Sequence, residues 1–180
     1  EKVVKTADGL AAHGHINEEA MERVISAIKE AQERIDFSST IVKAVTTEAM
    51  RRADNAEEVL SQIEKETGVA FEIISGDTEA RLTLIGVKDR LSKLQYASDT
   101  FVLIDIGGGS TELIFHYPDE MISKSFPIGI VTIAQTYKDL ENIEKALPEV
   151  MLDIQMFCAQ VYATKGKVHS FVATSGTPTT

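Results

Sequence analysis

Two carboxylates and three glycines gather in one short stretch, residues 103–113, which reads Leu-Ile-Asp-Ile-Gly-Gly-Gly-Ser-Thr-Glu-Leu. An apolar run delivers Asp105 to the start of the glycine turn, and Glu112 returns a second carboxylate to the same end of a hairpin. Glycines can adopt positive φ and let backbone N–H groups converge on an anion. Ser110 and Thr111 add hydroxyl donors. The pattern favours a phosphate-binding turn, although a glycine-rich hairpin with an Asp at a strand end would show the same residues.

Two common phosphate loops do not match this turn. A Walker loop needs Gly-Lys-Ser/Thr at the start of a helix, and the turn has no such lysine. A Rossmann fingerprint also leads into a helix. Residues 112–117, Glu-Leu-Ile-Phe-His-Tyr, are rich in strand formers. The turn therefore joins two antiparallel strands, as the phosphate loop of actin-like (ribonuclease-H-like) proteins does.

A further carboxylate, Glu79, follows the turn Ser75-Gly76-Asp77. Asp77 or Thr78 can cap a helix there, which places Glu79 in the first turn of that helix. Taken alone, Glu79 is most simply a residue that complements the helix dipole.

Two arginines, Arg51 and Arg52, follow an apolar run at residues 41–45. Either guanidinium could clamp a phosphate through two hydrogen bonds. Taken alone, either is more often a solvated charge on a helix.

The elements that position these residues alternate helix and strand in the first half and open with three strands in the second. Expected strands are 41–45, 69–74, 101–106, 112–117, 121–126 and 167–173. A helix is expected after a cap at Asn17, with Met21, Val24, Ile25, Ile28 and Ile35 as its apolar positions; a second is expected after a capping box of Asn55 and Glu58, ending at Gly68. Three more are expected: one carrying Leu82, Ile85 and Val87 to the core, one from about Val131, and one from Pro148. The character of the chain changes near residue 97, which predicts two α/β lobes, residues 1–97 and 98–180.

The composition excludes some classes of protein. The 180 residues carry a formal net charge of −10, which disfavours general nucleic-acid binding. An anionic substrate stays compatible, because backbone N–H groups and Mg²⁺ bind phosphate without a large basic surface. No apolar segment is long enough to predict a membrane helix. The single cysteine, Cys158, lies in an apolar context, so we expect a buried structural thiol and a cytoplasmic location.

Taken in order along the chain, these motifs are similar to the Ppx/GppA family of exopolyphosphatases and guanosine pentaphosphatases. The pairing of residues 73–82, Ile-Ile-Ser-Gly-Asp-Thr-Glu-Ala-Arg-Leu, with residues 103–113 carries most of the resemblance. Shorter matches lie at residues 7–10, 47–51, 127–129 and 175–177.

The resemblance implies an α/β, actin-like ATPase (ribonuclease-H-like) fold with two lobes, both incomplete in this chain, and an active site in the cleft between them. It implies that Glu79 is the general base that activates water, and that Asp105 and Glu112 organise Mg²⁺ and that water. The implied phosphate ligands are Arg51, Gly107, Gly108, Gly109, Ser110, and a second loop containing Gly176 and Thr177. A homodimer is suggested by the resemblance alone.

The implied function is Mg²⁺-dependent removal of the terminal phosphate from inorganic polyphosphate, guanosine pentaphosphate or both. An actin-like nucleotide or alarmone-binding module without turnover is the alternative, and Glu79 argues against it, since a binder needs no water-orienting carboxylate. An actin-like sugar kinase or ATPase would fit the glycine turn but not residues 75–81. The chain has no counterpart of the family's first phosphate loop, so we expect a fragment. The residue after Gly129 is Ile130 where some relatives carry cysteine, which argues against an essential thiol there.

Overall fold

The computed structural model describes residues 2–97 and 99–174, and the chain divides into two compact units, Glu1–Ile74 and Ser75–Thr180. This division lies earlier than the boundary predicted near residue 97. The reason is the long helix α5 (Gly76–Lys93), which packs Ala80 and Leu84 against the sheet of the second unit. The change in composition near residue 97 marks a change of element type, not a change of packing unit.

Two helices and a two-stranded parallel sheet form most of the first unit. Asn17 caps α2 (Glu18–Arg34) by accepting from the N–H of Ala20 at 2.7 Å, as predicted. The apolar stripe of α2 packs against α4 (Ala56–Thr67), which ends at Gly68 with φ of 71°. The strands β1 (Ala44–Thr46) and β2 (Phe71–Ile73) pair in parallel, and the short helices α1 (Leu10–His13) and α3 (Glu48–Arg52) complete the unit.

Two expectations for the first unit are wrong in detail. The strand predicted at residues 41–45 begins at Ala44, and Ile41 is 99% exposed, because only residues from 44 onward meet β2. Asn55 does not cap α4 with its side chain. Its amide instead bonds both the N–H and the carbonyl of Ile16, each at 2.9 Å, and so ties two distant segments together.

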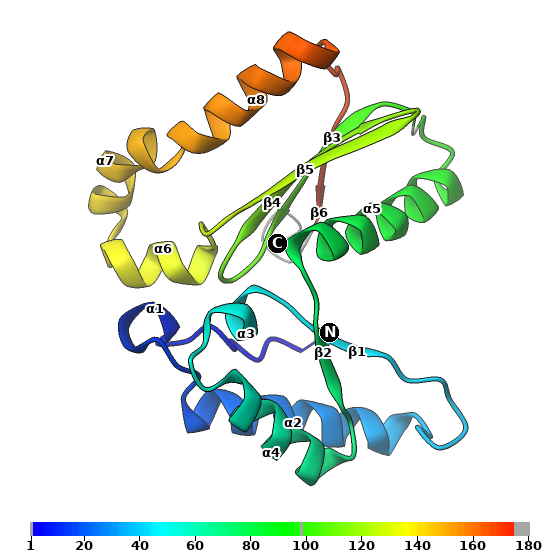
Figure 1. Cartoon of the computed structure of the whole chain (residues 1–180), viewed down its shortest axis with the longest axis vertical. Helices are drawn as coiled ribbons and strands as arrows, with labels where there is room; N and C mark the ends of the chain where they lie inside the picture. Colours follow the sequence, from blue (N-terminus) through cyan, green and yellow to red (C-terminus); the bar gives the residue numbers. More distant parts are fainter. Residues whose placement is uncertain (1, 98, 175–180) are drawn as a thin grey trace. The chain divides into compact units, whose positions relative to one another are not determined.

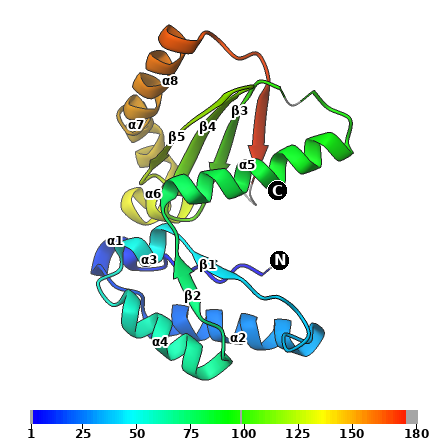
Figure 2. The ribbon, with the colours of Figure 1, turned by 45° about the vertical axis from the view of Figure 1, so that its right-hand side comes forward.

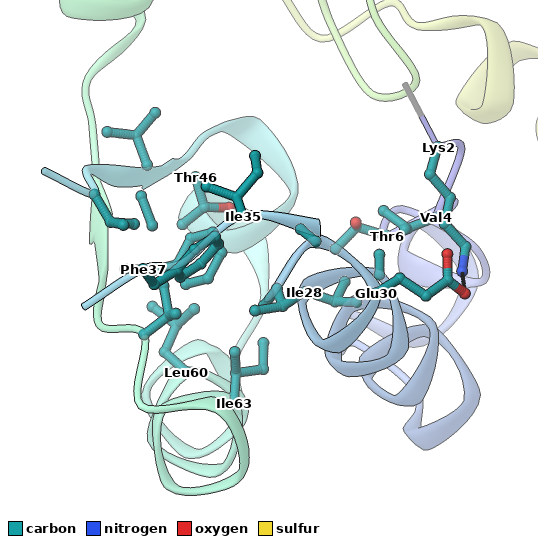
Figure 3. A pocket seen from close by; sticks show the side chains of 18 of the residues that line it. Lys2, Val4, Thr6, Ile28, Glu30, Ile35, Phe37, Thr46, Leu60 and Ile63 are labelled. Carbon is teal, nitrogen blue, oxygen red and sulfur yellow. Dashed lines mark hydrogen bonds and ion pairs between the residues drawn. The ribbon is translucent and has the colours of Figure 1, made fainter. Parts of the chain in front are cut away.

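The first unit also contains an apolar cavity of about 820 Å³. Figure 3 shows Ile28, Ile35, Phe37, Leu60 and Ile63 around it. The polar groups at its rim include Lys2 and Glu30, which form an ion pair with each other. The cavity holds none of the residues to which the sequence assigns chemistry.

A four-stranded sheet is the centre of the second unit, with the strands in the order β5-β4-β3-β6. The strands β3 (Phe101–Ile106), β4 (Thr111–Tyr117) and β5 (Glu120–Phe126) form an antiparallel meander, and β6 (Phe171–Thr174) pairs in parallel with β3. The three predicted strands of the meander are confirmed to within a residue or so at each end. The last strand is shorter than the predicted 167–173.

Helices cover both faces of this sheet (Figure 1). On one face α5 packs Ala80 and Leu84 against Phe101, Leu103 and Ile114. On the other face α8 (Leu152–Lys165) packs Ile154 and Val161 onto a cluster that includes Val102, Leu113, Phe115 and Phe126. Fully burying a side chain such as Phe115 contributes about 1.5–3 kcal/mol to folding. The two clusters hold β3 and β4, which carry the predicted site, between two layers.

The helices of the second unit differ from prediction at two points. Pro148 lies inside α7 (Leu140–Val150) instead of starting a helix, and it stands three residues before the break at Met151 that separates α7 from α8. Leu82 and Ile85 of α5 are exposed, since the stripe that faces the sheet is Ala80, Leu84, Val87 and Leu91. The helix predicted near Val131 is α6 (Ile130–Tyr137). No helix among the described residues is long and apolar enough to span a bilayer.

Candidate functional site

Four polar residues lie side by side on one face of the second unit's sheet. Glu112 on β4 stands directly opposite Asp105 on β3 and, on its other side, opposite Ser125 on β5. Asp105 in turn pairs with Thr174 on β6. Directly paired residues share a face of a sheet and, in an antiparallel pair, have Cβ atoms about 4.5–5.5 Å apart. Ser125, Glu112, Asp105 and Thr174 therefore form a continuous line across all four strands, called here the polar row.

Helix α5 runs across the strands of this sheet (Figure 2). Gly76 lies against Ser125, and Thr83 lies against Asp105, with its hydroxyl 3.4 Å from Oδ2. Glu79 stands between Gly76 and Thr83 on the same stripe of the helix, three residues after one and four before the other. Three to four helical residues advance about 4.5–6 Å, close to the strand spacing of about 4.8 Å. Gly76 thus lies over β5 and Thr83 over β3. Glu79, between them, lies over β4, beside Glu112.

The start of α5 is fixed by Ser75, not by Asp77 or Thr78 as predicted. The Ser75 hydroxyl accepts from the N–H of Thr78 at 3.2 Å, so the helix begins at Gly76. Asp77 and Glu79 both lie in the first turn, where an acidic residue interacts favourably with the helix dipole. Asp77 points to solvent and pairs with Arg81, whereas Glu79 is half-buried. Only one of the two first-turn acids is therefore directed at the polar row.

Glu112 is a buried carboxylate, with 3% of its surface exposed. Ser125 Oγ donates to its Oε1 at 2.7 Å, and the buried Ser110 lies near the same carboxylate. Burial raises the pKa of Glu112 above its ordinary value, the Glu79 and Asp105 carboxylates raise it further, and the two serine hydroxyls lower it. Glu112 therefore lies in a region with an excess of negative charge.

The glycine turn is held in place through its carbonyl groups. Ile130 N–H donates to Gly107 O at 3.0 Å, and Val131 N–H donates to Gly108 O at 2.9 Å, so the first turn of α6 binds the loop. Gly129 makes this approach possible. A Cβ at Gly129 would lie 2.3 Å from Gly108 O and 2.4 Å from Gly109 N, so no larger residue fits without moving backbone.

The predicted reason for the glycines of the loop is wrong in part. Gly107 and Gly108 do not adopt positive φ; the glycine that the loop requires for close approach is Gly129. The N–H of Gly107 donates to Ser110 O at 2.9 Å and is thereby occupied. The N–H groups of Gly108 and Gly109 donate to no described residue, so both can meet an anion.

The carboxylates of the polar row are suitable for binding Mg²⁺ if the ion takes its other ligands from substrate and water. Mg²⁺ prefers oxygen ligands and is usually held by one or two carboxylates together with substrate phosphates and water. Asp105 and Glu112 supply two carboxylates at paired positions, and a cation there would offset the repulsion between them. Among the described residues, no three Asp, Glu, His or Cys side chains come together closely enough to hold a metal ion by themselves.

A recess of about 470 Å³ adjoins the row between α5 and β6. Thr83, Asp105 and Thr174 line the part of it next to the row, and Leu82, Val87 and Arg90 are among the residues that line the remainder. Asp105 therefore faces a hollow with room for a ligand.

Arg51 belongs to the first unit. Its Nε and Nη2 donate to Glu48 Oε2 at 3.2 and 3.0 Å, and its Nη1 donates to the carbonyl of Ile74 at 2.6 Å. The guanidinium is thus fixed to the last residue of the first unit. Arg52 is more exposed and lies 3.9 Å from Glu48. The other predicted phosphate loop, with Gly176 and Thr177, lies outside the described residues.

The histidines His13 and His15 and the cysteine Cys158 are further side chains that could carry chemistry. His15 Nδ1 lies 2.9 Å from the carbonyl of His13, and the two rings are 5.8 Å apart, with no metal cluster around them among the described residues. Cys158 is half-buried and not fully buried as predicted, and its partial burial raises the pKa of the thiol, which makes it a poor nucleophile.

Ser125, Thr83 and Thr174 were not predicted as site residues. A signal for Ser125 exists in the sequence: a two-residue connection, Pro118-Asp119, sets Tyr117 opposite Glu120 and, counting back, Glu112 opposite Ser125. Thr83 follows Glu79 by one helical turn. Thr174 depends on the parallel pairing of β6 with β3, which local sequence does not determine.

Comparison with known proteins places this geometry in context. A sequence model of the Ppx/GppA phosphatase family matches residues 1–177. A Ppx/GppA family member from Aquifex aeolicus is 30% identical with a TM-score of 0.68, and an exopolyphosphatase from Cytophaga hutchinsonii is 25% identical with a TM-score of 0.80. Both matches cover 98% of this chain, but 56% and 57% of those two chains, respectively. The expected α/β, actin-like fold class is confirmed.

Proposed function

Because the chain belongs to the Ppx/GppA phosphatase family, we propose that it supplies the catalytic face of a Mg²⁺-dependent phosphoanhydride hydrolase. The substrate is inorganic polyphosphate, guanosine pentaphosphate or both, and the reaction removes the terminal phosphate. One observation carries the proposal: α5 runs over the strands that bear the paired carboxylates Asp105 and Glu112, and Glu79 in its first turn is near enough to Glu112 for the two charges to interact.

Glu79 is the general base in this proposal. A carboxylate that aligns water opposite the leaving group must be held rigidly, and α5 holds Glu79 through the Ser75 cap and the packing of the adjacent Ala80 and of Leu84. A residue that served the helix dipole alone would have no reason to face the polar row, as Asp77 illustrates by facing solvent.

The turn between β3 and β4 binds the terminal phosphate. The N–H groups of Gly108 and Gly109 point to this role because they have no acceptor among the described residues. Ser110 is 4% exposed and its hydroxyl lowers the pKa of Glu112, so it acts on the carboxylate as well as belonging to the turn. Phosphoryl transfer depends mainly on positioning and on stabilising charge at the phosphate oxygens, which such a turn supplies.

Asp105 and Glu112 would hold Mg²⁺. When bound, the ion offsets the charge of the phosphate oxygens and of the two carboxylates. Without a cation, the net charge of −10 would oppose the approach of a polyanion. The proposal therefore requires that substrate affinity depend on the divalent cation.

Phosphate release from the full-length protein tests the proposal. Long-chain polyphosphate and guanosine pentaphosphate are each incubated with Mg²⁺ and with EDTA, and inorganic phosphate is measured over time. We expect Mg²⁺-dependent release from at least one substrate. Binding of both substrates with no release from either would contradict hydrolysis and support a binding module.

A further inference from the structure

Ser125 belongs to none of the sequence motifs, yet it contacts a residue of the polar row directly. Its Oγ donates to Glu112 Oε1 at 2.7 Å from the neighbouring strand. Ser123, two residues earlier on the same face of β5, stands opposite the apolar Ile114. The strand thus places one of its two serines on this face against the carboxylate and the other against the core.

The first turn of α5 restricts what residue 125 can be. A Cβ at Gly76 would lie 3.4 Å from the Cβ of Ser125, so the helix passes directly over this side chain. A larger residue at position 125 would meet the helix, and an apolar residue would leave Glu112 Oε1 without this donor. A small hydroxyl side chain satisfies both demands.

The hydrogen bond matters because Glu112 is buried beside like charges. Its exposure is 3%, and Glu79 and Asp105 lie near it. When a buried carboxylate loses a hydrogen bond, the folded state is destabilised, and the carboxylate can rotate toward other donors. The hydroxyl of Ser125 fixes the position of Oε1, and with it the orientation of the Glu112 carboxylate.

We propose that Ser125 is a positioning residue, which holds the Glu112 carboxylate in the orientation that lets Glu112 and Asp105 bind a divalent cation together. This inference rests on the proposed function for its role in turnover, but its effect on cation binding is independent of turnover. Residues that orient a carboxylate ligand commonly affect metal affinity or activity about 10–100-fold when they are replaced.

The test compares Ser125→Ala with Ser123→Ala in the full-length protein. Mn²⁺ binding is followed by electron paramagnetic resonance without substrate, and phosphate release is measured at saturating Mg²⁺. For Ser125→Ala we expect Mn²⁺ affinity to fall about tenfold. We also expect kcat to fall about tenfold, with KM changed less than about twofold. Ser123→Ala should match the wild type in all three measurements, because Ser123 stands opposite Ile114.

The outcomes separate this inference from the proposed function. Unchanged Mn²⁺ affinity in Ser125→Ala, or an equal loss in Ser123→Ala, overturns the role of Ser125. If the wild type releases no phosphate but Ser125→Ala still weakens Mn²⁺ binding, the hydrolase proposal fails while the positioning role stands. Thermal unfolding of both variants within about 2 °C of the wild type shows that the loss is local, since about 1 kcal/mol shifts Tm by about 2–4 °C at this size.

Discussion

At the scale of single residues, the site combines a buried carboxylate with neighbours of the same charge. Glu112 has a raised pKa because of its burial and, secondarily, because of Glu79 and Asp105. A carboxylate whose pKa is raised on folding binds more protons in the folded chain than in the unfolded one. Burial of Glu112 therefore costs the folded chain least at a pH below the pKa that Glu112 has in the unfolded chain. The free energy of unfolding falls as the pH rises from that value through the higher pKa of the folded chain.

Glu112→Gln should therefore stabilise the metal-free chain at neutral pH. The amide removes the buried charge while its oxygen can still accept from Ser125. We expect Tm in EDTA to rise by about 2–4 °C at pH 7, equivalent to about 1 kcal/mol, and the gain to shrink toward zero at pH 4. Glu149→Gln, at an exposed position on α7, is the control and should change little. A gain that does not depend on pH would contradict the electrostatic explanation.

Gly129 is the second residue whose replacement gives a sharp result. In Gly129→Ala the new Cβ would overlap the backbone of Gly108 and Gly109, which cannot move without breaking the bonds to α6. We expect a loss of about 2–3 kcal/mol in the free energy of unfolding, measured with urea. Gly86→Ala is the matched control, because Gly86 lies in α5 with open space around it. Alanine at this helical position should raise the free energy of unfolding by about 0.5–1 kcal/mol. Equal behaviour of the two variants would show that the loop does not constrain residue 129.

At the scale of elements, α5 is the part that turns a polar row into a site with a water-orienting carboxylate. Its register over the sheet follows from the apolar stripe Ala80, Leu84, Val87 and Leu91, and its start follows from the Ser75 cap. Both must hold for Glu79 to reach Glu112.

Ser75→Ala tests the cap. Loss of the hydroxyl that accepts from Thr78 N–H should cost about 1 kcal/mol and let the first turn fray, with a several-fold lower kcat because Glu79 lies in that turn. Ser75→Asp retains an acceptor and should restore stability. Thermal unfolding and phosphate release are measured on both variants. If the aspartate variant loses as much as the alanine variant, capping does not explain the role of residue 75.

Much of this arrangement could be predicted from local sequence, and particular residues show where prediction stopped. The hairpin of β3 and β4 was predictable because two short runs of strand formers flank a glycine turn, and this also predicted that Asp105 and Glu112 share an end. The inward face of α5 was assigned wrongly because Leu82 and Ile85 are more apolar than Ala80, although Ala80, Leu84, Val87 and Leu91 keep the helical period. Thr174 could not be predicted, since a parallel partner is set by a connection of more than sixty residues between Ile106 and Phe171.

At the scale of the whole molecule, the chain is two compact units with different contributions. The second unit contains the row, the glycine turn and Glu79, while the first contains Arg51, bonded to the carbonyl of Ile74. The lobe boundary predicted near residue 97 coincides with the start of the meander, whereas the two packing units divide after Ile74 because α5 packs on that meander. The homodimer suggested by the resemblance stays a prediction.

The most direct test of the account compares the two acidic residues in the first turn of α5. Phosphate release with Mg²⁺ is measured for the full-length wild type, Glu79→Gln and Asp77→Asn. Both substitutions remove a negative charge that interacts favourably with the dipole of α5, but only Glu79 faces the polar row. The account predicts that Glu79→Gln lowers kcat by about 10²–10⁴-fold, the usual contribution of a general base, while Asp77→Asn stays within about twofold of the wild type. Full activity in Glu79→Gln, or an equal loss in both variants, would contradict it.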